Sequence, residues 1–166
     1  MGQVTLKGSP FATSGDLPAV GSEAPDFRLV AADMSDASLA TYAGKRKVVS
    51  IVPSLDTPVC QTMTRTFNEK ASALDNTVVL VVSADLPFAM KRFCESADIE
   101  GVHPLSMMRG KNFAKDYGIL ITEGPLEGVT GRAVVVIDEN DKVVHSQLVT
   151  EIADEPDYDA VLASLG

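Results

Sequence analysis

The sequence predicts an α/β fold with a central mixed sheet flanked by helices. Two apolar runs rich in β-branched residues, at 48–52 and 77–83, are each followed by a segment with helical periodicity. Near the C-terminus, two strand-like runs are separated by a tight turn and followed by an amphipathic helix. The length of 166 residues is typical of one ordinary domain. We therefore expect a single domain over residues 1–166.

The N-terminal part of the chain is expected to hold a hairpin and a further strand. Segments 4–6 and 11–13 alternate polar and apolar residues on either side of Gly-Ser-Pro at 8–10, which indicates an N-terminal β-hairpin. Residues 26–30 are expected to form an edge strand, because a proline directly precedes them and marks a boundary.

The strand at 48–52 leads into a helix. Pro53 ends the strand because proline cannot donate a hydrogen bond to a neighbouring strand. The helix is expected over 58–73, with Thr57 or the aspartate before it at the N-cap and a proline at the first position. Cys60 then lies about one turn into the helix, where unpaired N–H groups and the helix dipole favour a thiolate.

The middle of the chain continues the strand–helix alternation. Residues 77–83 are rich in β-branched residues, as expected for a central strand that is covered on both faces. Helical periodicity predicts a helix over 87–97, and Cys94 lies on its apolar stripe. A short helix is expected at 111–117.

The C-terminal part is expected to form a hairpin and a last helix. Strand-like runs at 133–137 and 142–148 flank the turn-forming sequence Asp-Glu-Asn-Asp at 138–141. Pro156 opens a helix whose apolar side comprises Tyr158, Val161, Leu162 and Leu165.

Composition excludes several function classes. The formal net charge of −9 disfavours nucleic acid and anionic membranes as partners, because both need clustered Lys and Arg. The basic run at 45–47 is short, and we expect it at the solvated entry to a strand. No apolar run approaches the roughly 20 residues of a membrane span. The N-terminal residues lack the features of a signal peptide, so we expect a cytoplasmic protein.

The two cysteines leave two possibilities open. Cys60 and Cys94 do not form a C-x-x-C pair, so the thioredoxin-type redox motif is absent. With only two histidines and no tight ligand spacing, a zinc site is not expected. A helical cysteine such as Cys94 is more often a buried core residue than a catalyst. The two thiols are therefore either inert or cycle between thiol and disulfide.

A fast thiol reaction needs more than an ionised sulfur. Lowering a thiol pKa from about 8.5 to about 6 raises the thiolate fraction at pH 7 only about 30-fold. Nucleophilicity falls as the pKa falls, so the net gain is smaller. Donors that stabilise charge on the leaving oxygen are therefore needed as well. Thr57 supplies a hydroxyl group close to the cysteine, and a cation has to come from elsewhere in the chain.

The residues around Cys60 resemble a known family. Pro53, Thr57 and Cys60 match the P-x-x-x-T-x-x-C signature of peroxiredoxins. The run Ser-Leu-Asp-Thr-Pro-Val-Cys at 54–60 is similar to that of bacterial thiol peroxidases, which are atypical 2-Cys peroxiredoxins. Further similar runs lie at 83–89, 92–94, 132–141 and 155–158, so the resemblance spans nearly the whole chain.

The resemblance implies a thioredoxin-like fold and an enzyme that reduces hydroperoxides without metal, haem or flavin. It implies that Cys60 is the peroxidatic cysteine and that Cys94 is the resolving cysteine. It also implies that Thr57 orients the peroxide, that Pro53 shields the site, and that Arg132 supplies the cation.

Some of these residues have plainer interpretations when the resemblance is set aside. The pattern around Arg132, at the start of a strand and beside a glycine, is typical of a solvated residue at the rim of a sheet. Asp56 and Asp85 are expected to be helix caps.

The implied cycle runs through a sulfenic acid at Cys60 and an intramolecular disulfide with Cys94, which reduced thioredoxin opens. A disulfide needs Cα atoms within roughly 7 Å. Both predicted helices are packed, so we expect one or both to unwind locally. The family also implies a homodimer. Two other interpretations stay open: a peroxide sensor or relay that passes oxidation to a partner protein, and a structural protein with inert thiols.

Overall fold

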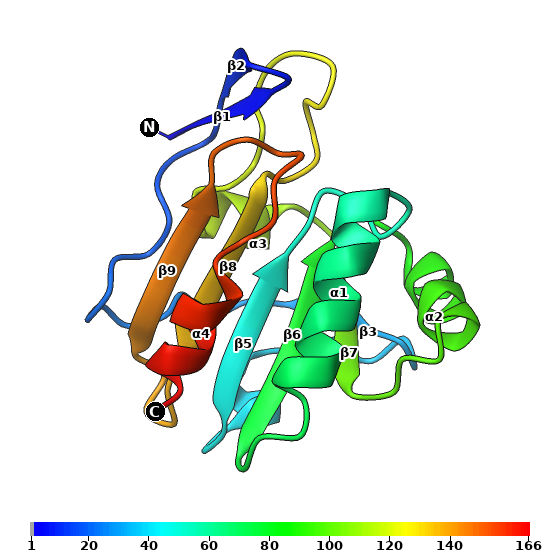
Figure 1. Ribbon diagram of the computed structural model, residues 1–166, viewed down its shortest axis with the longest axis vertical. Helices are drawn as coiled ribbons and strands as arrows, with labels where there is room; N and C mark the ends of the chain where they lie inside the picture. Colours follow the sequence, from blue (N-terminus) through cyan, green and yellow to red (C-terminus); the bar gives the residue numbers. More distant parts are fainter. Residues whose placement is uncertain (1) are drawn as a thin grey trace.

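The structure is a computed structural model that describes residues 2–166. A seven-stranded sheet forms its centre, with the strand order β4-β3-β7-β6-β5-β8-β9 (Figure 1). Strands β5, β6 and β7 are parallel neighbours, and the other pairs are antiparallel. The predicted α/β class with a mixed sheet is confirmed. The strands are β3 (Leu29–Ala31), β4 (Asp36–Ala37), β5 (Arg46–Ile51), β6 (Thr77–Ser83), β7 (Val102–Ser106), β8 (Arg132–Ile137) and β9 (Val143–Val149), with β1 (Gln3–Leu6) and β2 (Ser9–Ala12) in a separate hairpin.

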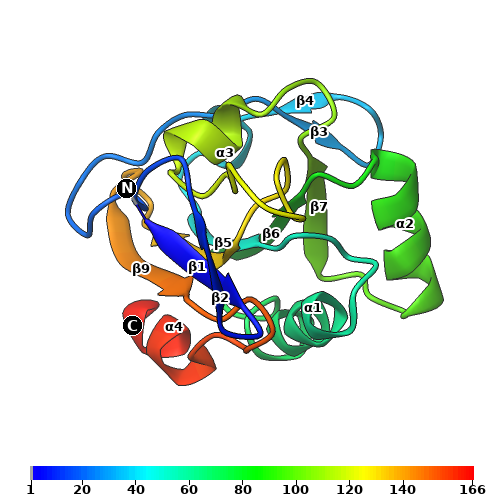
Figure 2. The same ribbon diagram turned by 90° about the horizontal axis from the view of Figure 1, so that it is seen from above.

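Helices cover both faces of the sheet (Figure 2). They are α1 (Pro58–Lys70), α2 (Pro87–Ser96), α3 (Asn112–Asp116), α4 (Tyr158–Ser164) and the 3-10 helix η1 (Leu39–Tyr42). Successive side chains of a strand point to opposite faces. Accordingly, Val79 and Val81 of β6 pack in the cluster beneath α1, α2 and α4, whereas Leu80 packs in the cluster beneath α3. None of the helices within residues 2–166 is long and apolar enough to cross a membrane.

Most of the predicted elements are present, with shifted ends. The strand at 77–83 and the helix start at residue 58 are as predicted, but α1 ends at Lys70. The strand expected at 26–30 is observed as β3, and it is not an edge strand because β4 pairs with its outer side.

Strand β7 lies outside the predicted elements because Pro104 interrupts its pattern. The proline is tolerated there because β3 pairs with β7 only at Leu105 and Ser106. Pro104 therefore has a neighbouring strand on one side only, where it lies opposite Val81 of β6.

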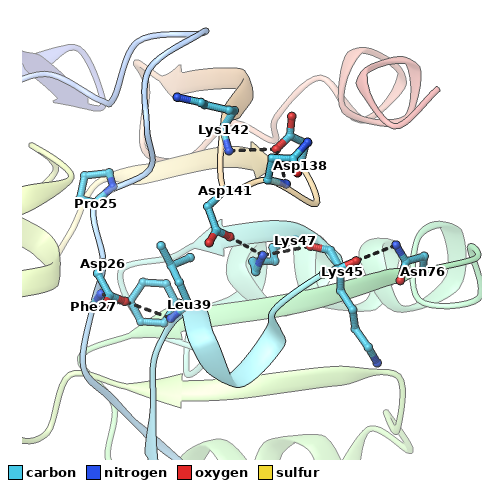
Figure 3. Close-up of polar contacts among 12 residues, drawn as sticks. Pro25, Asp26, Phe27, Leu39, Lys45, Lys47, Asn76, Asp138, Asp141 and Lys142 are labelled. Carbon is cyan, nitrogen blue, oxygen red and sulfur yellow. Dashed lines mark hydrogen bonds and ion pairs between the residues drawn. The ribbon is translucent and has the colours of Figure 1, made fainter.

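The basic run at 45–47 differs from the prediction, because Lys47 is fully buried. Its Nζ atom donates hydrogen bonds to Asp141 Oδ1 at 2.8 Å and to the Lys45 carbonyl oxygen at 3.0 Å (Figure 3). Lys47 lies in β5, which has β6 on one side and β8 on the other, and its side chain is fully buried. The ammonium group is therefore paired within the protein, as a buried charge must be.

Removal of Asp141 is expected to destabilise the fold. Asp141→Gly leaves the Lys47 charge without its carboxylate and should lower the free energy of unfolding by about 2–3 kcal/mol. Glycine suits the φ of 60° at this position, so backbone strain does not contribute. Adding Lys47→Met should recover part of the loss. Urea denaturation measures each variant, and an equal loss with and without Lys47 would contradict the explanation.

The N-terminal hairpin forms as predicted and docks on the segment that follows β9. The Ile152 N–H donates to the Thr5 carbonyl oxygen at 2.8 Å, and Val4 is fully buried in a small cluster with Ile152. The hairpin therefore holds Ile152 in place, and the Ile152 carbonyl oxygen in turn accepts a hydrogen bond from Arg132.

Candidate active site

Cys60 lies in the first turn of α1, just beyond the carboxyl end of β5. Thr57 is the N-cap residue, with extended backbone angles (φ −125°, ψ 148°), and Pro58 occupies the first turn of the helix. Of the two predicted cap residues, Thr57 is the N-cap and Asp56 is not, and the Thr57 hydroxyl makes no capping bond. It donates instead to the Ser54 carbonyl oxygen at 2.9 Å. Cys60 is fully buried.

Arg132 reaches the Cys60 sulfur from the neighbouring strand β8. Because β8 runs antiparallel to β5, the first residue of β8 lies beside the end of β5. Arg132 is 2% exposed, and its Nη1 atom lies 3.2 Å from Cys60 Sγ. Its Nε atom donates to the Ile152 carbonyl oxygen at 3.0 Å. The local pattern that indicates a solvated arginine is therefore misleading, since the side chain lies inside the fold.

The guanidinium group sets the electrostatics of the site. A permanent cation in contact with a buried sulfur can stabilise negative charge that develops there during a reaction. Met63 Sδ lies 3.6 Å from the same Nη1 atom, so a second sulfur packs against the cation. Fixed N–H donors at this position can also stabilise negative charge on an oxygen that leaves during a reaction at the sulfur.

Pro53 and Thr57 lie on the loop that leads to Cys60. Pro53 is buried two residues after the end of β5, and Thr57 is half-buried one turn before the cysteine. Thr130 Oγ1 donates to the carbonyl oxygen of Val52 at 3.1 Å, which ties the start of this loop to the segment preceding β8. The structure thus brings Cys60 and Arg132 into contact and places Pro53 and Thr57 on the adjoining loop.

Cys94 lies on α2, in the same apolar cluster as Cys60. Burial raises the pKa of the Cys94 thiol, and the neighbouring Glu95 carboxylate raises it further. A raised pKa keeps Cys94 protonated at neutral pH, so it is a thiol and not a thiolate. Both cysteines are free, and each is held in a regular helix.

Asp85 is not the helix cap that the sequence pattern indicates. The N-cap of α2 is Leu86, which makes no side-chain capping bond. The Asp85 carboxylate instead accepts hydrogen bonds from Ser54 Oγ, the Leu55 N–H and Ser83 Oγ, each at 2.7 Å. The Ser-Ala-Asp sequence at 83–85 indicates a local hydrogen bond, but nothing in it points to partners on another loop.

A groove of about 630 Å³ opens between the loop that precedes α1 and helix α2. Its lining residues are Leu55, Asp56, Gln61, Asp85, Phe88, Ala89, Arg92, Phe93 and Ser96. Phe88 is 65% exposed at its rim. Within residues 2–166, no group of three or more His, Cys, Asp or Glu side chains is placed to hold a metal ion.

Comparisons with known proteins identify relatives along nearly the whole chain. The family model described as Redoxin matches residues 19–162. A thiol peroxidase from Corynebacterium glutamicum is 47% identical over 165 residues, which cover 99% of each chain. A solved peroxiredoxin-like protein from Aquifex aeolicus is 44% identical with a TM-score of 0.92, covering 98% of this chain and 95% of the other. A thiol peroxidase from Chromobacterium violaceum is 27% identical with a TM-score of 0.88 and the same coverage, 98% and 95%.

These similarities extend over nearly the whole chain and include the loop, strand and helix that hold Cys60 and Arg132. The solved relatives are a peroxiredoxin-like protein and a thiol peroxidase, and the expected thioredoxin-like fold is confirmed. The chain therefore belongs to the redoxin family, among the thiol peroxidases of the peroxiredoxin type.

Proposed function

We propose that this enzyme is a thioredoxin-dependent peroxiredoxin that serves antioxidant defence. Its substrates would be hydrogen peroxide and organic hydroperoxides, both alkyl and lipid, which it reduces to water and alcohols. The supporting observation is the 3.2 Å contact between Arg132 Nη1 and Cys60 Sγ in a buried site at a helix start. This contact supports a thiolate nucleophile with a fixed cation beside the bond that it breaks.

In the first half of the proposed cycle, Cys60 reduces the peroxide. The thiolate attacks the terminal peroxide oxygen and the O–O bond breaks, which leaves a sulfenic acid on sulfur. The other oxygen leaves with the electron pair and takes up a proton to become an alcohol or water. In this proposal Arg132 stabilises the leaving oxygen, the Thr57 hydroxyl orients the peroxide, and Pro53 shields the site.

In the second half, Cys94 resolves the sulfenic acid. Its sulfur attacks the Cys60 sulfur, the S–O bond breaks, and water leaves as the disulfide forms. A dithiol reductant, thioredoxin, then supplies two electrons and two protons, which restores both thiols and converts the reductant to its disulfide. Both cysteines lie in packed helices, whereas a disulfide needs Cα atoms within roughly 7 Å. We therefore propose that α1, α2 or both unwind locally in each cycle.

We also propose a domain organisation, an oligomeric state and a cellular location for the enzyme. The chain would act as a single domain over residues 1–166, as a homodimer in the cytoplasm, and without a bound cofactor. The formal net charge of −9 supports a protein that has no nucleic acid partner.

A coupled assay with NADPH, thioredoxin reductase, thioredoxin and hydroperoxide tests the proposal. Hydrogen peroxide, cumene hydroperoxide and a fatty-acid hydroperoxide are compared, and omission of thioredoxin is the control. We expect NADPH oxidation that depends on both thioredoxin and the protein. Negligible NADPH oxidation, together with transfer of oxidation from Cys60 to another protein, would instead indicate a peroxide sensor or relay.

A further inference from the structure

Asp85 links the two segments that carry the cysteines. It follows β6 and directly precedes Leu86, the N-cap of α2, which carries Cys94. Its Oδ1 atom accepts a hydrogen bond from Ser54 Oγ, and its Oδ2 atom accepts one from the Leu55 N–H, both at 2.7 Å. Because β5 and β6 are parallel neighbours, both segments leave the sheet at the same edge (Figure 1).

On one side, the carboxylate fixes the turn that precedes α1. Ser54 Oγ also accepts a hydrogen bond from the Asp56 N–H at 3.1 Å, and the Ser54 carbonyl oxygen accepts one from Thr57 Oγ1 at 2.9 Å. Thr57 is the N-cap of α1, so its position sets that of the first turn, which contains Cys60. A continuous chain of hydrogen bonds thus runs from Asp85 to the start of α1.

On the other side, Asp85 is fixed to the sheet. Ser83 Oγ, buried at the end of β6, donates to Asp85 Oδ2 at 2.7 Å, and the Asp85 N–H donates back to Ser83 Oγ at 3.2 Å. Ser106 Oγ, at the end of β7, donates to the Asp85 carbonyl oxygen. Hydrogen bonds to an ionised acceptor are about twice as strong as neutral ones. The carboxylate is therefore a rigid anchor between sheet and loop.

We propose that Asp85 is a positioning residue that holds the loop at 54–57 in the arrangement that reacts with peroxide. The same hydrogen bonds oppose the unwinding that joins Cys60 to Cys94, because the loop cannot move away from α2 without breaking them. Asp85 thereby sets the balance between peroxide reduction and disulfide formation. This inference rests on the proposed function, since it needs the disulfide cycle.

Asp85→Asn tests this role. Asparagine has the shape of aspartate, but an NH₂ group replaces one of the two carboxylate oxygens. At least one of the three groups that donate hydrogen bonds to Asp85 then faces another donor and loses its hydrogen bond. In stopped-flow experiments with hydrogen peroxide, we expect the second-order rate constant of Cys60 oxidation to fall about tenfold and disulfide formation to accelerate about tenfold. Ser54→Ala removes one donor on the loop side and should move both rates in the same directions by roughly threefold.

Asp75→Asn is the matched control, because Asp75 is an exposed carboxylate in the turn before β6, at the opposite end of that strand from Asp85. Both rates should stay at wild-type values in this variant. A general loss of stability would also ease unwinding, so the free energy of unfolding of each variant is measured by urea denaturation. Opposite changes in the two rates in a variant of wild-type stability identify positioning.

Two results would overturn the role of Asp85: a fall in both rates, or two rates within about twofold of wild type. If Asp85→Asn does not fold, Ser54→Ala decides by the direction of its two changes. Failure of the wild-type protein to form the Cys60–Cys94 disulfide would instead refute the proposed function, so the two failures are distinguishable.

Discussion

Replacing Cys60 with serine is expected to abolish hydroperoxide consumption. A serine hydroxyl stays protonated and cannot be oxidised to a sulfenic acid, so the first step of the proposed cycle has no nucleophile. The substitution changes one atom in a fully buried site, and we expect the fold to persist. NADPH oxidation in the coupled assay should fall to the rate seen without the protein, while the thermal unfolding midpoint stays close to that of wild type.

Cys94→Ser is the matched variant, and it should behave differently. It should still consume about one equivalent of peroxide per chain, because Cys60 can react once, but it should not turn over with thioredoxin. Trapping with dimedone should then label Cys60 and identify its sulfenic acid by mass. Sustained turnover in Cys60→Ser protein would show that the peroxidatic cysteine has been assigned wrongly.

The second large effect is expected at Arg132. Arg132→Met keeps a long side chain in the buried site but removes the cation that contacts the Cys60 sulfur. Loss of one preorganised donor typically costs about 10²–10³ in rate, and we expect a fall of this size in the second-order rate constant with hydrogen peroxide. Arg132→Lys keeps the charge but cannot reproduce the planar group that bonds both Ile152 and Cys60. Its loss should therefore be intermediate.

Alkylation of Cys60 by iodoacetamide separates two roles of Arg132. Alkylation also needs the thiolate, but no oxygen leaves in that reaction. A larger fall in the peroxide rate than in the alkylation rate therefore indicates that Arg132 also acts on the leaving oxygen. Arg28→Met is the control, since Arg28 is exposed and pairs with Asp36 at 3.0 Å. An unchanged peroxide rate in Arg132→Met would contradict the proposed role.

Elements with strong local patterns were predictable from the sequence. Strand β6 is buried along its whole length and matches the predicted range, and α1 begins at the predicted proline. Both signals depend only on residues within a few positions of each other. Strand β4 has two residues and β7 contains Pro104, so neither has a local pattern to detect. These strands form because β3 and β6 offer them partners.

In the candidate site, the position of Cys60 was predictable from the local sequence, whereas the surroundings of Arg132 and Asp85 were not. The local sequence places Cys60 at a helix start after a buried strand, and the structure agrees. The position of Arg132 followed only from resemblance to a family, since its own neighbourhood indicates a solvated residue. Asp85 and Lys47 were placed wrongly for the same reason: each is buried or anchored by a partner that lies far away in the sequence.

The sequence by itself determined the strand–helix alternation, the mixed sheet, and the position of Cys60 at a helix N-terminus. Only the tertiary structure decided which charges meet: Arg132 with the Cys60 sulfur, Asp85 with the loop before α1, and Lys47 with Asp141. The physical reason is the distance along the sequence over which each interaction acts. Propensity, capping and periodicity act between near neighbours, whereas burial of a charge depends on the strand order that places β8 and β6 on either side of β5.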